Sequence, residues 1–291
     1  MFAIIGLLVV VGSVLGGFLF AGGRIMALAQ PAEFLVIGGT ALGTVLISTS
    51  PMVLKGLGAR FGLMFQNSGF GKPLYLDALK LLYELFQTAR RDGLVAIESH
   101  VESPQKSALF RRYPSVLRHA HAVQFLCDSL RLVLMGSVPP YDLESLMDAE
   151  IDVHHEAEAR SVSALQKVSD SLPGIGIVAA VLGIVITMGA IAGPIEEIGH
   201  HVAAALTGTF MGVLLAYGFV GPMAGAMENV NAAEARFYHF LRAAVVAFAK
   251  GFSPIVALEF ARRAIYAEDR PTFGEMEAAC KGTRNKPAEG S

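Results

Sequence analysis

Charged residues at positions 90–104 offer the clearest chemistry in this 291-residue sequence, and that chemistry is electrostatic rather than catalytic. The stretch reads RRDGLVAIESHVESP, so two arginines are followed, after a short turn, by acids. Arg90 and Glu98 therefore place opposite charges close together on what we expect to be an exposed surface. Two interpretations remain open: a local surface ion pair worth about 0–1 kcal/mol, or a docking surface complementary to a charged partner.

A second charged stretch, residues 142–158, reads DLESLMDAEIDVHHEAE and contains seven acids without a lysine or arginine. Its pattern fits either a solvated helix face or a surface that meets a basic partner. Neighbouring histidines occur at 119/121, 154/155 and 200/201, and adjacent histidines do not share a helix face, so we do not interpret them as a metal-ligand set. We therefore predict no metal site, no catalytic constellation and no bound cofactor.

Four long apolar runs are candidate membrane spans, and their places in the sequence determine where these charges lie relative to the membrane. They cover residues 2–23, 34–54, 171–195 and 199–227, and a bilayer core needs about 20 apolar helical residues. The chain is 53% hydrophobic and only 16% charged. None of the four runs contains Asp, Glu, Lys or Arg. A proton path usually needs an intramembrane carboxylate, so any such path requires a carboxylate from another chain.

The predicted fold class is an all-α integral membrane protein with four transmembrane helices and a large helical cytoplasmic domain. The predicted domains are 1–54 (spans one and two), 55–170 (cytoplasmic), 171–227 (spans three and four) and 228–291 (a cytoplasmic tail, disordered over 282–291). Helices are expected near 73–93, 114–134 and 139–170, the last running into span three. Lysines and arginines number 13 in 55–170 and nine in 228–291, which predicts that both termini are cytoplasmic.

Small residues and prolines mark spans three and four. Ala204, Gly208, Gly212 and Ala216 repeat every four residues, a pattern typical of close helix packing, either between chains or within one chain. The same reasoning explains the glycines of 174–179, which resemble a dinucleotide-binding pattern but lack its preceding strand. Prolines at 173 and 222 predict kinks at the ends of these spans, or ordinary helix starts.

Four segments carry a resemblance to a known family: RRDGLVAIESHVESP, LPGIGIVAAVLGIVITM, TGTFMGVLLAYGFVGPMA and RPTFGEMEAA. With their order and spacing, the chain resembles the flagellar motor stator family MotA, of the MotA/TolQ/ExbB proton channel superfamily, over nearly its full length. The resemblance implies a multi-pass protein of the bacterial inner membrane, surrounded by lipid. It implies a pentamer around a MotB-like single-span, peptidoglycan-binding subunit that supplies an Asp. Inward proton flow would then turn the rotor protein FliG, with no role for nucleic acid.

Carried over by motif position, the resemblance assigns roles to eight residues of this sequence. Arg90 and Glu98 are the charges that face the rotor, and Glu150 of the acidic helix adds to that surface. Pro173 and Pro222 couple ion flow to torque. Thr209 and Tyr217 lie along the ion path. Ala180 occupies a position where sodium-driven relatives are expected to have Thr; the loss of that oxygen ligand favours protons.

Two alternatives compete with this interpretation. An ExbB/TolQ-like energy-transducing subunit would also form a charge-poor ring, but such proteins usually have three spans and an outside N-terminus. A helical membrane scaffold without ion flow would need no partner carboxylate. Four spans and the RRDGLVAIES motif favour the stator family.

Overall fold

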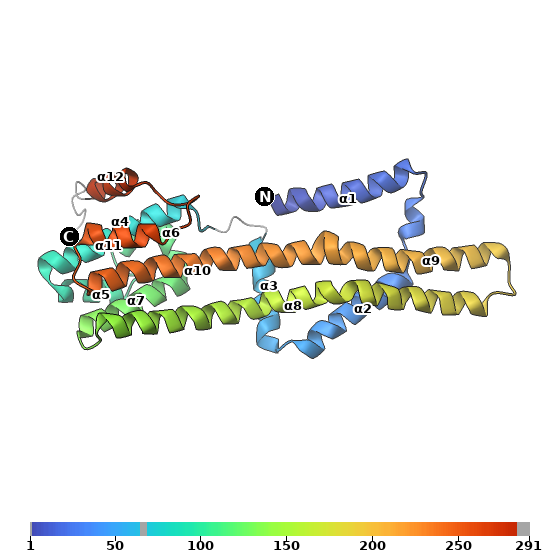
Figure 1. The fold of residues 1–291 in the computed structure, drawn as a ribbon, viewed down its shortest axis with the longest axis horizontal. Helices are drawn as coiled ribbons and strands as arrows, with labels where there is room; N and C mark the ends of the chain where they lie inside the picture. Colours follow the sequence, from blue (N-terminus) through green and yellow to red (C-terminus); the bar gives the residue numbers. More distant parts are fainter. Residues whose placement is uncertain (1, 65–68, 284–291) are drawn as a thin grey trace. The chain divides into compact units, whose positions relative to one another are not determined.

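The computed structural model describes residues 2–64 and 69–283 (Figure 1). In this part of the chain every regular element is a helix, as predicted. The helices form two compact units, one from residues up to 64 together with 157–230, and the other from 69–156 together with 231–283. The end of the tail, 284–291, lies outside the described residues, as does most of the segment predicted to be disordered.

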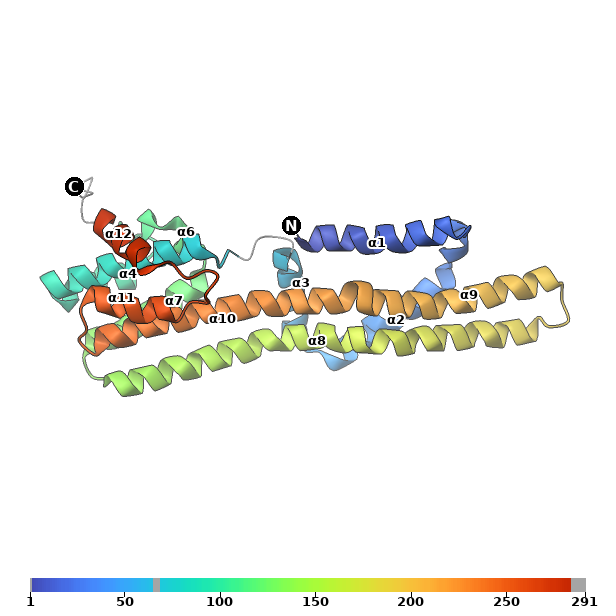
Figure 2. The ribbon, with the colours of Figure 1, turned by 45° about the horizontal axis from the view of Figure 1, so that its top comes forward.

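The first unit holds the apolar helices. In chain order it contains α1 (Phe2–Phe20), η1 (Ile25–Leu28), α2 (Pro31–Ser48), α3 (Pro51–Met64), the second part of α8 (Pro140–Gly189), α9 (Ile195–Leu214), η4 (Leu215–Val220) and the start of α10 (Gly221–Ala249). Four of its helices are long and apolar enough to cross a membrane by length and composition, which confirms the predicted number. Figures 1 and 2 show α8 and α9 side by side.

The bounds of the spans differ from the prediction in two places. Helix α2 begins at Pro31 and ends at Ser48, because Thr49 is extended and Pro51 opens a separate helix. The expected charge-free second span is therefore wrong, since α2 includes Glu33. The predicted end of span three at residue 195 and start of span four at residue 199 are also wrong, because α8 ends at Gly189. Helix α9 begins at Ile195 and has Glu196 and Glu197 in its first turn, where the helix dipole favours acids.

The second unit packs shorter amphipathic helices around one core. They are α4 (Lys72–Asp92), η2 (Leu94–Ile97), α5 (Glu98–Glu102), η3 (Phe110–Arg112), α6 (Pro114–Leu117), α7 (Ala120–Met135), parts of α8 and α10, α11 (Pro254–Arg263) and α12 (Phe273–Thr283). Leucines on one face of α4 are fully buried, as their helical spacing predicts. Phe86 of α4 stacks on Phe248 of α10 with ring centroids 4.2 Å apart.

The predicted helix 114–134 is divided into α6 and α7. The division falls at His119, whose backbone is not helical (φ −90°, ψ 69°). Its ring packs against Phe70 at a centroid distance of 4.5 Å. A tertiary contact thus interrupts a pattern that is locally compatible with one helix.

Two cysteines, Cys127 and Cys280, are buried in the core of the second unit and form no disulfide with each other. Their exposed fractions are 2% and 1%. Burial raises the pKa of both thiols to about 12, because a low-polarity environment disfavours the thiolate. This agrees with the absence of a disulfide framework in the sequence.

Candidate functional site

Arg90 and Glu98 lie on either side of a short connection in the second unit. Arg90 is in the last turn of α4, which ends at Asp92, and Gly93 takes a positive φ of 91° that favours glycine. The chain then passes through η2 to Glu98, the first residue of α5. Both side chains are exposed. Within the described residues they form no ion pair with each other or with a third group, so the first of the two open interpretations, a local surface ion pair, is not what the structure contains.

The neighbouring arginine behaves differently. Arg91 donates two hydrogen bonds to Asp92, from Nε to Oδ1 at 2.9 Å and from Nη2 to Oδ2 at 2.7 Å. These hydrogen bonds hold the pKa of the Asp92 carboxyl below its usual value. One arginine of the RR pair is thus occupied locally, whereas the guanidinium of Arg90 is available to a partner.

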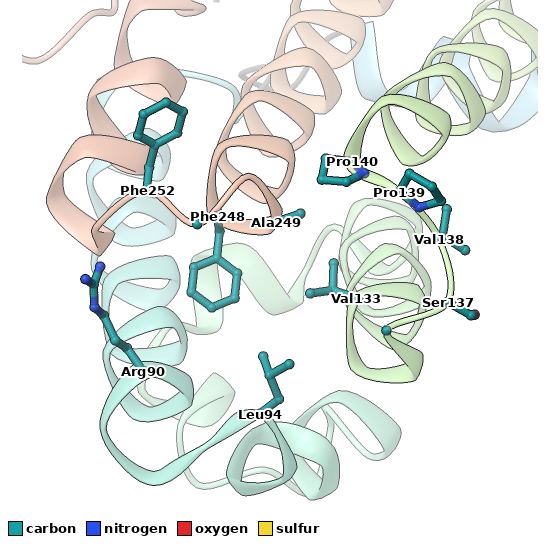
Figure 3. Close-up of a pocket in the computed structure, with 12 residues that line it drawn as sticks. Arg90, Leu94, Val133, Ser137, Val138, Pro139, Pro140, Phe248, Ala249 and Phe252 are labelled. Carbon is teal, nitrogen blue, oxygen red and sulfur yellow. The ribbon is translucent and has the colours of Figure 1, made fainter.

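Arg90 also lines a pocket of about 520 Å³ (Figure 3). The other walls are mainly apolar, and they include Leu94, Val133, Phe248 and Phe252. A cation beside an apolar hollow suits a partner surface that carries an acid next to apolar side chains.

The acidic first half of α8 is partly neutralised by α10 within the same unit. Arg242 of α10 pairs with Glu144 at 3.2 Å and also with Asp148, and Lys250 pairs with Glu144 at 2.9 Å. His154 Nε2 lies 3.5 Å from Glu234 Oε1, so one histidine does meet an acid from a helix distant in sequence. Both interpretations of the acidic stretch were therefore incomplete, because part of it binds basic residues of its own chain.

Glu150 lies on an exposed position of the same helix. Its pKa is raised, first by partial desolvation and then by the negative charge of Asp128, while His154 acts in the opposite direction. Glu150 thus retains an accessible carboxyl group on this unit.

In the first unit, α8 and α9 approach each other through glycines. A Cβ atom on Gly176 would lie 2.9 Å from the Gly208 carbonyl oxygen and 3.1 Å from the Gly212 Cα. A Cβ atom on Gly212 would lie 2.6 Å from the carbonyl oxygen of Leu172. Contacts this short exclude larger side chains, so backbone packs directly on backbone.

This packing decides between two interpretations of the small-residue stripe. Gly208, Gly212 and Ala216 are buried in the isolated chain, so contacts within one chain account for most of the stripe. Close packing is confirmed, but the stripe by itself gives no evidence for an oligomer.

The three residues expected along an ion path lie on this pair of helices in different environments. Ala180 and Thr209 are half-buried. Gly176, one turn before Ala180 in α8, approaches the Thr209 Cα of α9. Tyr217 lies in η4 and is 70% exposed, so its hydroxyl is not held within the helix pair of the isolated chain.

The two prolines lie near an irregular part of the same contact. Pro173 is inside the continuous helix α8. Pro222 is the second residue of α10, and Gly221 separates it from η4, a π-helical segment. The hydroxyl of Ser169, one turn before Pro173, donates to the Ala216 carbonyl of η4 at 3.0 Å. π-Helical turns are frequent at functional sites, so this crossing is a candidate point of conformational change.

Sequence reasoning missed Glu33 and Ser169. Glu33 falls just before the predicted second span, residues 34–54, because apolarity alone defines that span. Pro31 in the sequence Gln-Pro-Ala-Glu is nevertheless compatible with a helix start. Ser169 carried no recognisable pattern, since its partner is 47 residues away.

Comparisons with known proteins agree over nearly the whole chain. The family model Motility protein A N-terminal matches residues 4–93, and the MotA/TolQ/ExbB proton channel family matches residues 118–238. Motility protein A of Salmonella typhimurium is 36% identical over 98% of this chain and 97% of its own length. Chemotaxis protein LafT of Vibrio parahaemolyticus is 37% identical over 94% and 96%.

Solved structures show the same fold. A chain of the C. jejuni MotAB structure superposes with a TM-score of 0.76 at 20% identity, covering 93% of this chain and 98% of that chain. A chain of the flagellar MotAB stator complex from Bacillus subtilis gives 0.75 at 21% identity, covering 92% and 97%. Together with the four apolar helices, these matches indicate a multi-pass inner membrane protein. The chain belongs to the MotA/TolQ/ExbB proton channel family, and within it to the motility proteins that serve as flagellar stator subunits.

Proposed function

We propose that this chain and a MotB-like subunit form an inward proton-conducting complex that generates torque on the flagellar rotor. The observation that carries the proposal is the 36% identity to Motility protein A over 98% of the chain. The partner is a single-span, peptidoglycan-binding protein that supplies an Asp, and several copies of this chain, in a pentamer, surround it in the inner membrane. Basic residues concentrate in 55–170 and 228–291, which supports cytoplasmic termini.

The ion path in this proposal follows α8 and α9. Ala180 offers no side-chain oxygen for a sodium ion, so the transported ion is H⁺. Thr209 and Tyr217 supply hydroxyl groups near the path. The Asp of the partner remains part of the proposal, although the original reason for it, the absence of acids from the spans of this chain, no longer holds.

The rotor contact lies on the second unit. Arg90, Glu98 and Glu150 face the rotor protein FliG, and the first two are exposed and without an ion pair in the described residues. Pro173 and Pro222 transmit the effect of ion binding to this surface.

Charge reversal tests the proposal. In cells with this chain as their only stator subunit of its kind, Arg90→Glu should abolish swimming at normal protein level. A compensating reversal of an acidic rotor residue should restore swimming. Arg111→Glu, at another exposed arginine of the same unit, is the matched control and should swim normally. If wild-type protein does not support swimming, the stator role is wrong. If wild-type protein supports swimming and Arg90→Glu also swims normally, the assigned docking surface is wrong.

A further inference from the structure

Glu33 is a buried carboxylate in an apolar helix, and the proposed function gives it no role. It lies in the first turn of α2. Only 8% of the residue is exposed, and its Oε2 atom is buried with no hydrogen-bond partner among residues 2–64 and 69–283. A buried carboxylate without a partner is costly, and an acid within a membrane segment usually marks an ion or substrate pathway.

The carboxylate points at the contact between α8 and α9. A Cβ atom on Gly208 would lie 2.6 Å from Glu33 Oε2 and 3.1 Å from the Ala179 Cβ. Because Gly208 has no side chain, Oε2 can occupy this space. Gly208 is 13 residues beyond Ile195, the first residue of α9, which is about 20 Å along the helix. Glu33 thus reaches the middle of the apolar helix pair at Gly208, the residue before Thr209 in α9.

Few charged groups face this position. Helix α9, which packs on α2, carries its titratable residues in its first two turns: Glu196, Glu197, His200 and His201. Arg24 precedes η1, which also packs on α9. Residues 171–189 of α8 include no charged residue. None of these groups hydrogen-bonds to Oε2 in the described structure, so no basic side chain neutralises the carboxylate there.

We propose that Glu33 is a second proton-binding group of the ion path, contributed by this chain itself. The inference rests on the proposed function. A proton coming from outside binds Oε2, where an O–H bond forms and the negative charge disappears. The same bond breaks when the proton moves on, through water or the Thr209 hydroxyl, to the carboxylate of the partner. No electron transfer takes place, and the group returns to its initial state after each ion.

The first experiment measures swimming speed against external pH, in cells with this chain as their only stator subunit of its kind. Glu33→Gln keeps the size of the side chain but cannot titrate, whereas Glu33→Asp retains a carboxyl group. We expect Glu33→Gln to lower swimming speed and to flatten the dependence of that speed on external pH. Glu33→Asp should keep a pH-dependent speed with a shifted profile. Glu196→Gln, at an exposed acid of α9, is the matched control and should behave as wild type.

The second experiment follows the proton directly. Infrared difference spectra of the purified complex, recorded between mildly acidic and mildly alkaline pH, should contain a protonated-carboxyl band that Glu33→Gln removes and Glu196→Gln retains. This measurement does not depend on motility, so it distinguishes the two proposals. If wild-type protein fails to support swimming but the band is present, the stator role fails and Glu33 still binds a proton.

Three results would overturn the inference. The first is a Glu33→Gln variant with wild-type speed and pH profile. The second is a Glu33→Gln variant that is slow but keeps the wild-type pH profile, which would indicate a packing role. The third is an infrared spectrum without a Glu33-dependent band. If Glu33→Gln fails to assemble, the pH profile of Glu33→Asp decides, because an unchanged profile again contradicts proton binding.

Discussion

At the scale of single residues, the chain uses identical side chains for different purposes. Arg91 is held by Asp92, while the adjacent Arg90 has no ion-pair partner in the described residues and lines an apolar pocket. Glu144 is paired with Lys250, while Glu33 is buried and its Oε2 has no hydrogen-bond partner in the part of the chain that the structure describes. A charged residue with an ion-pair partner in the chain stabilises the fold, whereas one without such a partner is available for function.

Glu259 belongs to the stabilising group. It accepts hydrogen bonds from Arg262 at 2.7 Å and from Arg263 at 2.8 Å, and these lower the pKa of its carboxyl to about 2. Because the native pKa is below the ordinary value, the ionised group stabilises the fold above the ordinary carboxyl pKa, and that contribution is lost as pH falls toward 2. At neutral pH we expect Glu259→Gln to lower the free energy of unfolding by about 1 kcal/mol.

Denaturant unfolding followed by circular dichroism measures this effect on the detergent-solubilised chain. The difference between Glu259→Gln and wild type should shrink steadily in acid. Glu268→Gln, at an exposed acid without an ion pair in the described structure, should leave stability unchanged at every pH. A difference for Glu259→Gln that is constant down to strongly acidic pH would contradict the assigned pKa.

At the scale of elements, the α8–α9 contact depends on glycines with no space for a side chain. We expect Gly212→Ala to destabilise the first unit by about 1–3 kcal/mol, because the new methyl group would meet backbone atoms of α8 at 2.6–2.8 Å. Gly174→Ala is the matched control, since its Cβ atom would meet nothing within 4 Å. Thermal unfolding of both variants in detergent tests the prediction. Equal melting temperatures for Gly212→Ala and Gly174→Ala would refute it.

Helices were well predicted from the sequence where the spacing of apolar residues, or the length of an apolar run, defines the helix. The apolar stripe of α4, the continuation of α8 through Pro173 and the four long apolar helices all followed from such patterns. Element ends were less predictable. The break at His119 depends on a ring contact with Phe70, and the start of α2 at Pro31 precedes the apolar run that was used to define the span. The unpaired state of Arg90 also required the structure, because charge spacing in the sequence does not reveal which partner is chosen.

At the scale of the whole molecule, the long helices α8 and α10 each contribute residues to both compact units. Pro173 is inside α8, where it removes one helix N–H donor. We expect Pro173→Ala to assemble normally but to lower swimming torque severalfold, because the restored hydrogen bond stiffens α8. Torque can be measured from the rotation speed of tethered cells, and assembly from the amount of protein in isolated membranes.

Pro114→Ala provides the control for this prediction. Pro114 is exposed and opens the short helix α6, a position where proline is easily replaced. Its variant should produce full torque. Full torque from assembled Pro173→Ala would show that this proline has no part in coupling ion flow to rotation.

The burial of both cysteines has a practical consequence for such experiments. Cys127 and Cys280 are inaccessible and, with pKa values near 12, scarcely ionised at neutral pH. Thiolate is the form that reacts with maleimides and disulfide reagents. The natural chain is therefore a nearly unreactive background for thiol chemistry. Cysteines introduced one at a time, at Arg90 or on either side of α2, would report solvent access and the side of the membrane on which each position lies. The two natural cysteines would not have to be removed.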